Sequence, residues 1–88
     1  MISIIIRTKN EERWISHCLS AIENQDYDQF EVIVVDNEST DNTLQIVEQA
    51  RKKLPTLKVV NFSGPFKPGA AINLGISNSK GDIVVVLS

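Results

Sequence analysis

The sequence has one cysteine, no long hydrophobic run and no excess of positive charge. Cys18 has no second cysteine with which to form an internal disulfide, which is typical of a reducing compartment. The longest apolar runs have about five residues, whereas roughly 20 are needed to cross a bilayer, and we expect no signal peptide. Nine basic and eleven acidic side chains give a formal charge of −2. We therefore expect a cytoplasmic protein with no transmembrane segment and no nucleic-acid partner.

Common site motifs are also missing. There is no G-x-G-x-x-G and no G-x-x-x-x-G-K-[ST], so dinucleotide-binding and P-loop functions lose their main support. No serine is framed as G-x-S-x-G, which excludes the hydrolase nucleophile elbow. His17 is the only histidine, and a zinc site would need more ligands than this chain offers. We expect His17 to be an ordinary helix-face residue.

What is present is an alternation of strand and helix patterns in 88 residues, the size of one small domain. The four β-branched residues from Val32 to Val35 predict a strand buried on both faces of a parallel sheet. Asn10 is a candidate N-cap for the first helix, and Ser39 or Thr40 for the second. The predicted strands cover residues 2–6, 30–35, 57–62 and 83–87, the predicted helices cover about 11–24, 40–54 and 70–79, and residues 26–29 form a return loop.

This βαβαβαβ order is typical of a Rossmann-like α/β fold. The expected architecture is a three-layer sandwich, with helices on both faces of a four-stranded parallel sheet and right-handed crossovers. Two strand orders, 3-2-1-4 and 2-1-3-4, are compatible with the pattern, which does not choose between them. In either order, ligands bind beyond the carboxyl ends of the strands.

Polar side chains follow three of the predicted strands at that edge. Thr8 and Glu11 follow the first strand, Asp36 and Asn37 follow the second, and Lys67 lies in the loop after the third. A carboxylate or amide can bind the N–H and carbonyl edge of a pyrimidine, a threonine can bind a ribose or phosphate, and a lysine can offset diphosphate charge. Each residue alone is equally compatible with turn chemistry, such as an Asx-turn at Asp36 or Asn37. Their convergence on one edge favours a nucleotide site.

Four segments of the chain together resemble a known family. They are SIIIRTKNEE (residues 3–12), FEVIVVDNESTDNT (30–43), GAAINLG (69–75) and KGDIVVVL (80–87). In this order and spacing they closely resemble the amino-terminal half of a family 2 glycosyltransferase. The resemblance implies a partial GT-A fold of strand order 3-2-1-4, with residues 1–88 as a single truncated domain. It also implies a nucleoside-diphosphate-sugar donor, and it places Thr8, Glu11 and Asp36 in the nucleotide pocket. We expect a UDP or dTDP donor, although the sequence leaves guanosine open as well.

The resemblance also indicates which parts of the chemistry lie elsewhere. In the family, a carboxylate acts as general base on the acceptor hydroxyl, and a divalent metal (Mg or Mn) held by a D-x-D motif stabilises the departing diphosphate. Ser88 stands where the first aspartate of that motif would stand. After the second strand, where the family commonly has two aspartates, this chain has Asp36-Asn37. Arg7 and Lys9 stand where a proline and a tyrosine are common. The identity of the nucleotide base therefore stays open. We expect a donor-binding portion of a longer enzyme, inactive by itself.

Two other function classes fit the fold less well. A receiver-like signalling module would need an acidic cluster after the first strand and an aspartate after the third, where this chain has Arg7-Thr8-Lys9 and Asn61-Phe62-Ser63. A ligand-free binding module would not need the long loop at residues 63–69.

The last predicted strand has a consequence for association. In the order 3-2-1-4, the strand from Ile83 to Leu87 becomes an exposed apolar edge. Exposed apolar edges pair with other chains. We therefore expect self-association through this strand.

Overall fold

The computed structural model describes residues 1–24, 30–65 and 67–87, so the expected return loop at 26–29 and the position of Ser88 lie outside the described residues. Within them, strands and helices alternate as the sequence pattern predicts. The elements are β1 (Ile2–Thr8), α1 (Glu12–Glu23), β2 (Phe30–Asp36), α2 (Thr43–Ala50), β3 (Leu57–Asn61), α3 (Pro68–Ser77) and β4 (Ile83–Leu87).

The four strands form one parallel sheet of order β3-β2-β1-β4. Ile2 begins the register on both sides of β1, pairing with Phe30 of β2 and with Ile83 of β4. This order is the one implied by the resemblance, and it decides between the two orders that the strand pattern allows.

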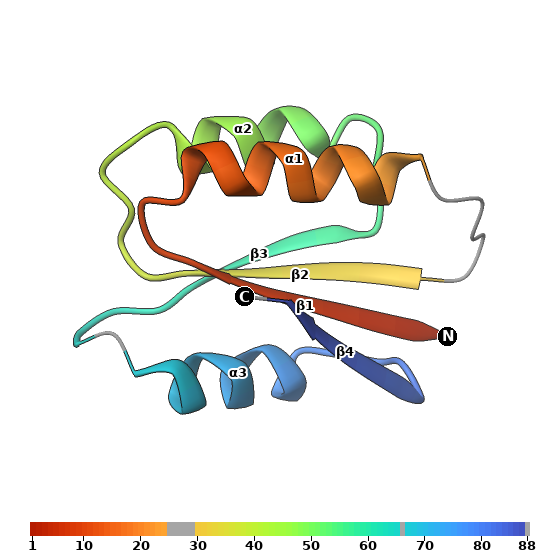
Figure 1. The fold of residues 1–88 in the computed structure, drawn as a ribbon. Helices are drawn as coiled ribbons and strands as arrows, with labels where there is room; N and C mark the ends of the chain where they lie inside the picture. The colour runs from red at the N-terminus through yellow and green to blue at the C-terminus, as the bar shows by residue number, and fades with distance from the viewer. Residues whose placement is uncertain (25–29, 66, 88) are drawn as a thin grey trace.

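Helices cover both faces of the sheet, which confirms the three-layer sandwich. Figure 1 shows α1 and α2 on one face and α3 on the other. Two groups of buried side chains result. One includes Ile6, Ile15, Val34 and Val47 between the sheet and the helix pair. The other, on the α3 face, consists of Ile5, Ile33, Val35 and Ala71. β1 and β2 are therefore buried on both faces, as the apolar run in β2 predicts.

The expected N-caps of the first two helices are wrong. Asn10 has a left-handed backbone (φ 52°), and α1 begins two residues later, at Glu12. α2 begins at Thr43, after both Ser39 and Thr40. In each case the polar side chains bond to the neighbouring loop, and that tertiary pairing delays the start of the helix.

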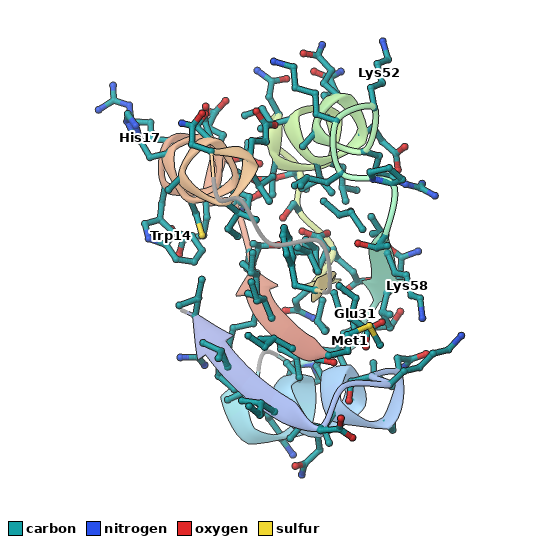
Figure 2. The ribbon with its side chains drawn as sticks, turned by 90° about the vertical axis from the view of Figure 1, so that its right-hand side faces the viewer. Met1, Trp14, His17, Glu31, Lys52 and Lys58 are labelled. Carbon is teal, nitrogen blue, oxygen red and sulfur yellow. The ribbon has the colours of Figure 1, made fainter. Side chains whose placement is uncertain are left out.

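The outer surfaces of the fold largely agree with the expectations from the sequence. His17 is exposed and points away from the sheet on the outer side of α1 (Figure 2). Cys18 is half-buried against the helix-pair core, and this burial raises the pKa of its thiol. β4 lies at the sheet edge, with Ile83 60% exposed and Val85 41% exposed. In the described part of the chain, no helix has the length and apolar character needed to span a membrane.

Candidate functional site

The carboxyl ends of β1, β2 and β3 meet at one edge of the sheet, which Figure 1 shows at the left. Backbone hydrogen bonds continue the pairing just past the strands. The N–H of Asn37 donates to the carbonyl of Thr8 at 2.9 Å, and the N–H of Phe62 donates to the carbonyl of Asp36 at 2.8 Å. The three strand ends are thus fixed to one another before any side chain is considered.

Thr8 and Asp36 are in direct contact across this edge. The Thr8 hydroxyl donates to Oδ1 of Asp36 at 2.8 Å, and both residues are only 1% exposed. Ser39 also binds the carboxylate, through its hydroxyl (2.6 Å to Oδ1) and its N–H (3.0 Å to Oδ2). A carboxylate has about four acceptor positions. The turn chemistry anticipated for Asp36 uses two of them, through Ser39, and Thr8 of β1 uses a third.

Asn37 is equally buried and bridges to the segment that follows β3. Its Nδ2 donates to the carbonyls of Phe62 (2.8 Å) and Gly64 (3.1 Å). Its Oδ1 is buried and has no hydrogen-bond partner among the described residues. A buried acceptor without a partner costs about 1–3 kcal/mol. Of the unfilled acceptors at this edge, Oδ1 of Asn37 is therefore the one with most to gain from a donor.

The other two expected site residues lie farther out. Glu11 is exposed in the β1–α1 loop, where its N–H donates to the hydroxyl of Thr43 at 3.0 Å. Lys67 is exposed and immediately precedes α3, three residues beyond Gly64. The structure thus brings Thr8, Asp36 and Asn37 together and leaves Glu11 and Lys67 on flanking loops.

Hydrogen bonds join the two loops above this edge, the β1–α1 loop and the β2–α2 loop. The sequence analysis did not predict that the residues of these loops bind one another. Oδ1 of Asn10 accepts the N–H groups of Thr40 (2.7 Å) and Asp41 (3.3 Å). In return, the N–H of Asn10 donates to the hydroxyl of Ser39 at 2.9 Å. The β1–α1 and β2–α2 loops therefore form one rigid rim.

Asp41 serves both helices from this rim. Its carboxylate accepts the N–H of Thr43 at the start of α2 (2.9 Å) and the N–H of Glu12 at the start of α1 (3.3 Å). Chiefly because the Thr43 hydroxyl donates a hydrogen bond to it, the pKa of Asp41 lies below its ordinary value. Asp41 then remains charged beside two positive helix ends. One sequence signal, an aspartate two residues before a threonine, could have indicated this cap, but the sequence analysis did not use it.

A shallow cavity of about 290 Å³ lies beside the rim. Its lining includes three acidic residues, together with Arg13 and the indole of Trp14; the full set is Asn10, Glu11, Glu12, Arg13, Trp14 and Asp41. No group of three or more acidic, histidine or cysteine side chains in the described ranges is arranged to hold a metal ion. The edge can therefore accept hydrogen bonds from a polar ligand, but its described residues do not fit a metal site.

Comparison with known proteins gives consistent matches. The family model of Glycosyl transferase family 2 matches residues 3–88. Among relatives, the poly(ribitol-phosphate) beta-N-acetylglucosaminyltransferase TarS of Staphylococcus aureus is 43% identical over 89 residues, covering 94% of this chain and 15% of TarS.

Solved structures resemble the fold closely. The crystal structure of S. aureus TarS 1-349 in complex with UDP-GlcNAc has a TM-score of 0.91 at 39% identity, over 98% of this chain and 25% of that one. The mannosyltransferase PcManGT from Pyrobaculum calidifontis, in complex with GDP-Man and Mn²⁺, has a TM-score of 0.85 at 33% identity, over 94% of this chain and 25% of that one. These likenesses confirm the partial GT-A fold, and the chain spans only a small part of each relative.

Proposed function

Because this chain belongs to glycosyl transferase family 2, we propose that it forms the donor-nucleotide floor of a longer glycosyltransferase. That enzyme moves a sugar from a nucleoside diphosphate to an acceptor hydroxyl. One observation carries the proposal. Thr8, Asp36 and Asn37 meet at the carboxyl edge of a sheet whose fold matches, at a TM-score of 0.91, a structure that holds UDP-GlcNAc.

The acceptor chemistry of this edge supports a base that donates an N–H group. Asp36 offers only acceptors, and both amide hydrogens of Asn37 are already used within the protein. Uracil and thymine carry an imide N–H between two carbonyls, so a UDP or dTDP donor suits the edge. Guanine has a comparable N–H, and PcManGT holds GDP-Man. GDP is therefore the comparison ligand for the test.

Two flanking residues complete the proposed pocket. Glu11, which lines the cavity at the rim, is placed to accept hydrogen bonds from ribose hydroxyls. We propose that Lys67, exposed ahead of α3, offsets the diphosphate charge. A divalent metal such as Mg or Mn would offset the same charge in the whole enzyme. Because the described residues do not fit a metal site, no step of the proposal depends on them for metal binding.

We propose that the 88 residues bind the donor without transferring its sugar. Transfer needs a general base, a charge-stabilising site and an acceptor pocket held together. The chain spans 15% of TarS, and the buried carboxylate of Asp36 already accepts hydrogen bonds from Thr8 and Ser39. Sugar transfer by the purified chain would contradict this.

The binding test is a heteronuclear NMR titration of the labelled chain with UDP, dTDP and GDP. We expect saturable shifts centred on Thr8, Asp36 and Asn37. Asp36→Asn should weaken UDP binding by about tenfold or more, because it replaces a charged acceptor in a buried network. Asp82→Asn makes the same chemical change at an exposed residue beside the amino ends of the strands, and it should leave binding unchanged. A well-dispersed spectrum that responds to none of the three nucleotides would overturn the proposal.

We further propose that the chain self-associates through β4. From Ile83 to Val86 every side chain is 37–60% exposed, none is charged, and the strand is a sheet edge. Sedimentation velocity should show a dimer fraction that increases with protein concentration. Val85→Lys should shift the profile toward monomer, whereas Gln45→Lys, which adds the same charge to an exposed position of α2, should not. A monomeric wild-type profile at high concentration would refute the proposal.

A further inference from the structure

We infer that Asn37 is a positioning residue of the donor site, which acts by holding the segment 62–64 against the carboxyl end of β2. The inference rests on the proposed function and adds a role for the side-chain nitrogen. That nitrogen faces the protein, so its contribution to nucleotide binding is made through the segment it holds.

The geometry assigns both amide hydrogens of Asn37 to this segment. Nδ2 donates to the carbonyls of Phe62 and Gly64, two residues apart, and Asn37 is 1% exposed. The Phe62 N–H also donates to the carbonyl of Asp36. The segment is thus fixed by three hydrogen bonds to two consecutive residues of the β2 end.

The same contacts explain why an amide stands at this position. An aspartate has no N–H to donate, and when ionised it would place a buried negative charge against two carbonyl oxygens. An asparagine satisfies both carbonyls and remains neutral. The two acceptors also fix which amide atom is nitrogen, so Oδ1 has a defined orientation at the site.

Lys67 lies three residues after Gly64, the end of the held segment, in the sequence. Gly64 has a φ of +102°, a backbone conformation that glycine adopts easily and other residues do not. The chain then enters α3 at Pro68, immediately after Lys67. Because only two residues separate Gly64 from Lys67, we expect a shift of the segment to move Lys67 as well. Asn37 and Lys67 should therefore be energetically coupled in nucleotide binding.

The test measures UDP affinity of the whole chain by NMR titration. Asn37→Asp should weaken binding by about tenfold or more at neutral pH and speed amide exchange in residues 62–64. Affinity should partly recover near pH 5, because the introduced carboxyl faces two acceptors, has a raised pKa, and can donate one hydrogen bond once protonated. Asn37→Ala should weaken binding without this recovery. Thermal unfolding of both variants over the same pH range tests a role in folding alone, for which the lost affinity would follow the lost stability at every pH.

Two further variants keep the inference testable if Asn37→Asp does not fold. Gly64→Ala leaves Asn37 intact, and its Cβ would meet no atom of the described residues within 4 Å, but it disfavours the positive φ. It should weaken UDP binding in the same way. Lys67→Ala should cost much less affinity in the Asn37→Ala background than in the wild type.

The outcomes separate the two proposals. A folded wild-type chain that binds none of the three nucleotides defeats the proposed function. A wild-type chain that binds UDP, with Asn37→Ala and Gly64→Ala binding equally well, defeats the inference alone. Full additivity of the Asn37 and Lys67 substitutions also defeats it.

Discussion

Ser3 donates its hydroxyl hydrogen to the carboxylate of Glu31 at 2.6 Å, across the ladder between β1 and β2. Thr8 and Asp36 repeat this relationship at the other end of the same two strands. The amino-end pair is closed by other parts of the chain: the Lys80 N–H donates to Glu31, and Lys58 lies 3.5 Å from it (Figure 2). Among the described residues, the side chains of the carboxyl-end pair are bound by Ser39 of the β2–α2 loop, and this is the end at which we propose that a nucleotide binds.

The first prediction concerns pH and Glu31. Burial alone would raise its pKa, but hydrogen bonds from Ser3 and the Lys80 N–H, with the charge of Lys58, outweigh burial and hold the pKa below its ordinary value. Ionised Glu31 therefore stabilises the fold above the unfolded-state pKa of about 4.3. That stability is lost as pH falls from there through the lower native pKa.

Thermal unfolding between about pH 7 and pH 3 measures this effect. The loss of stability should begin at about pH 4.3, the ordinary pKa of glutamate, and continue at lower pH. Glu31→Gln should lower the stability at neutral pH by about 1–3 kcal/mol and flatten the acid limb of the profile. An unchanged acid limb in the variant would show that other carboxylates govern it.

The second prediction concerns Asp41. Asp41→Ala should lower the melting temperature and speed amide exchange at both Glu12 and Thr43, because one carboxylate accepts both N–H groups. Asn42→Ala is the control: Asn42 precedes α2 directly but makes no side-chain cap. Equal melting temperatures for the two variants would show that Asp41 does not stabilise the starts of both helices.

The third prediction compares two glycines of α3. A Cβ at Gly75 would lie 2.6 Å from Cγ2 of Ile5 and 3.2 Å from Cγ2 of Val35, whereas one at Gly69 would meet nothing within 4 Å. Gly75→Ala should destabilise the fold by about 1–3 kcal/mol through overpacking. Gly69→Ala should stabilise it by about 0.4–1 kcal/mol. Denaturant unfolding of both variants measures the difference, and equal stabilities would mean that α3 moves freely away from the sheet.

The fourth prediction concerns the two left-handed residues of the rim. Asn10 and Glu38 each follow a strand end by two residues and have φ values of 52° and 51°. Asparagine tolerates this conformation, but glutamate is strained by about 1 kcal/mol. Glu38→Asn should therefore raise the unfolding free energy by up to about 1 kcal/mol. A loss of stability would mean that the Glu38 side chain makes a contact worth more than the strain.

The strands could be predicted from sequence because their signal is local. A run such as Val32 to Val35 has few stable places other than the centre of a sheet. The sheet order could not be derived from the pattern, since it depends on which strand β4 joins, and only the family resemblance supplied it. The first two helix starts were placed too early because Asn10 bonds to the opposite loop, a contact that no local pattern contains.

The candidate site was predictable to a similar depth. The rule that parallel strands end at one edge brings Thr8, Asp36 and Asn37 together. The rule does not say which way each amide or hydroxyl points. The sequence could not indicate that Asn37 faces the carbonyls of Phe62 and Gly64, because those carbonyls belong to the backbone and carry no residue signature.

The pairing of β1 with β4 affects how the chain folds. The Gly81 N–H reaches the Ser3 hydroxyl at 2.8 Å, a contact that spans 78 positions of sequence. Contacts of such separation carry the largest loop-closure entropy and slow folding. β1, β2 and β3 with their two helices can assemble through shorter loops, so we expect β4 to dock after them, onto the open side of β1. During synthesis on the ribosome, β1 can therefore complete its pairing on this side only after the residues of β4, Ile83–Leu87, have been added.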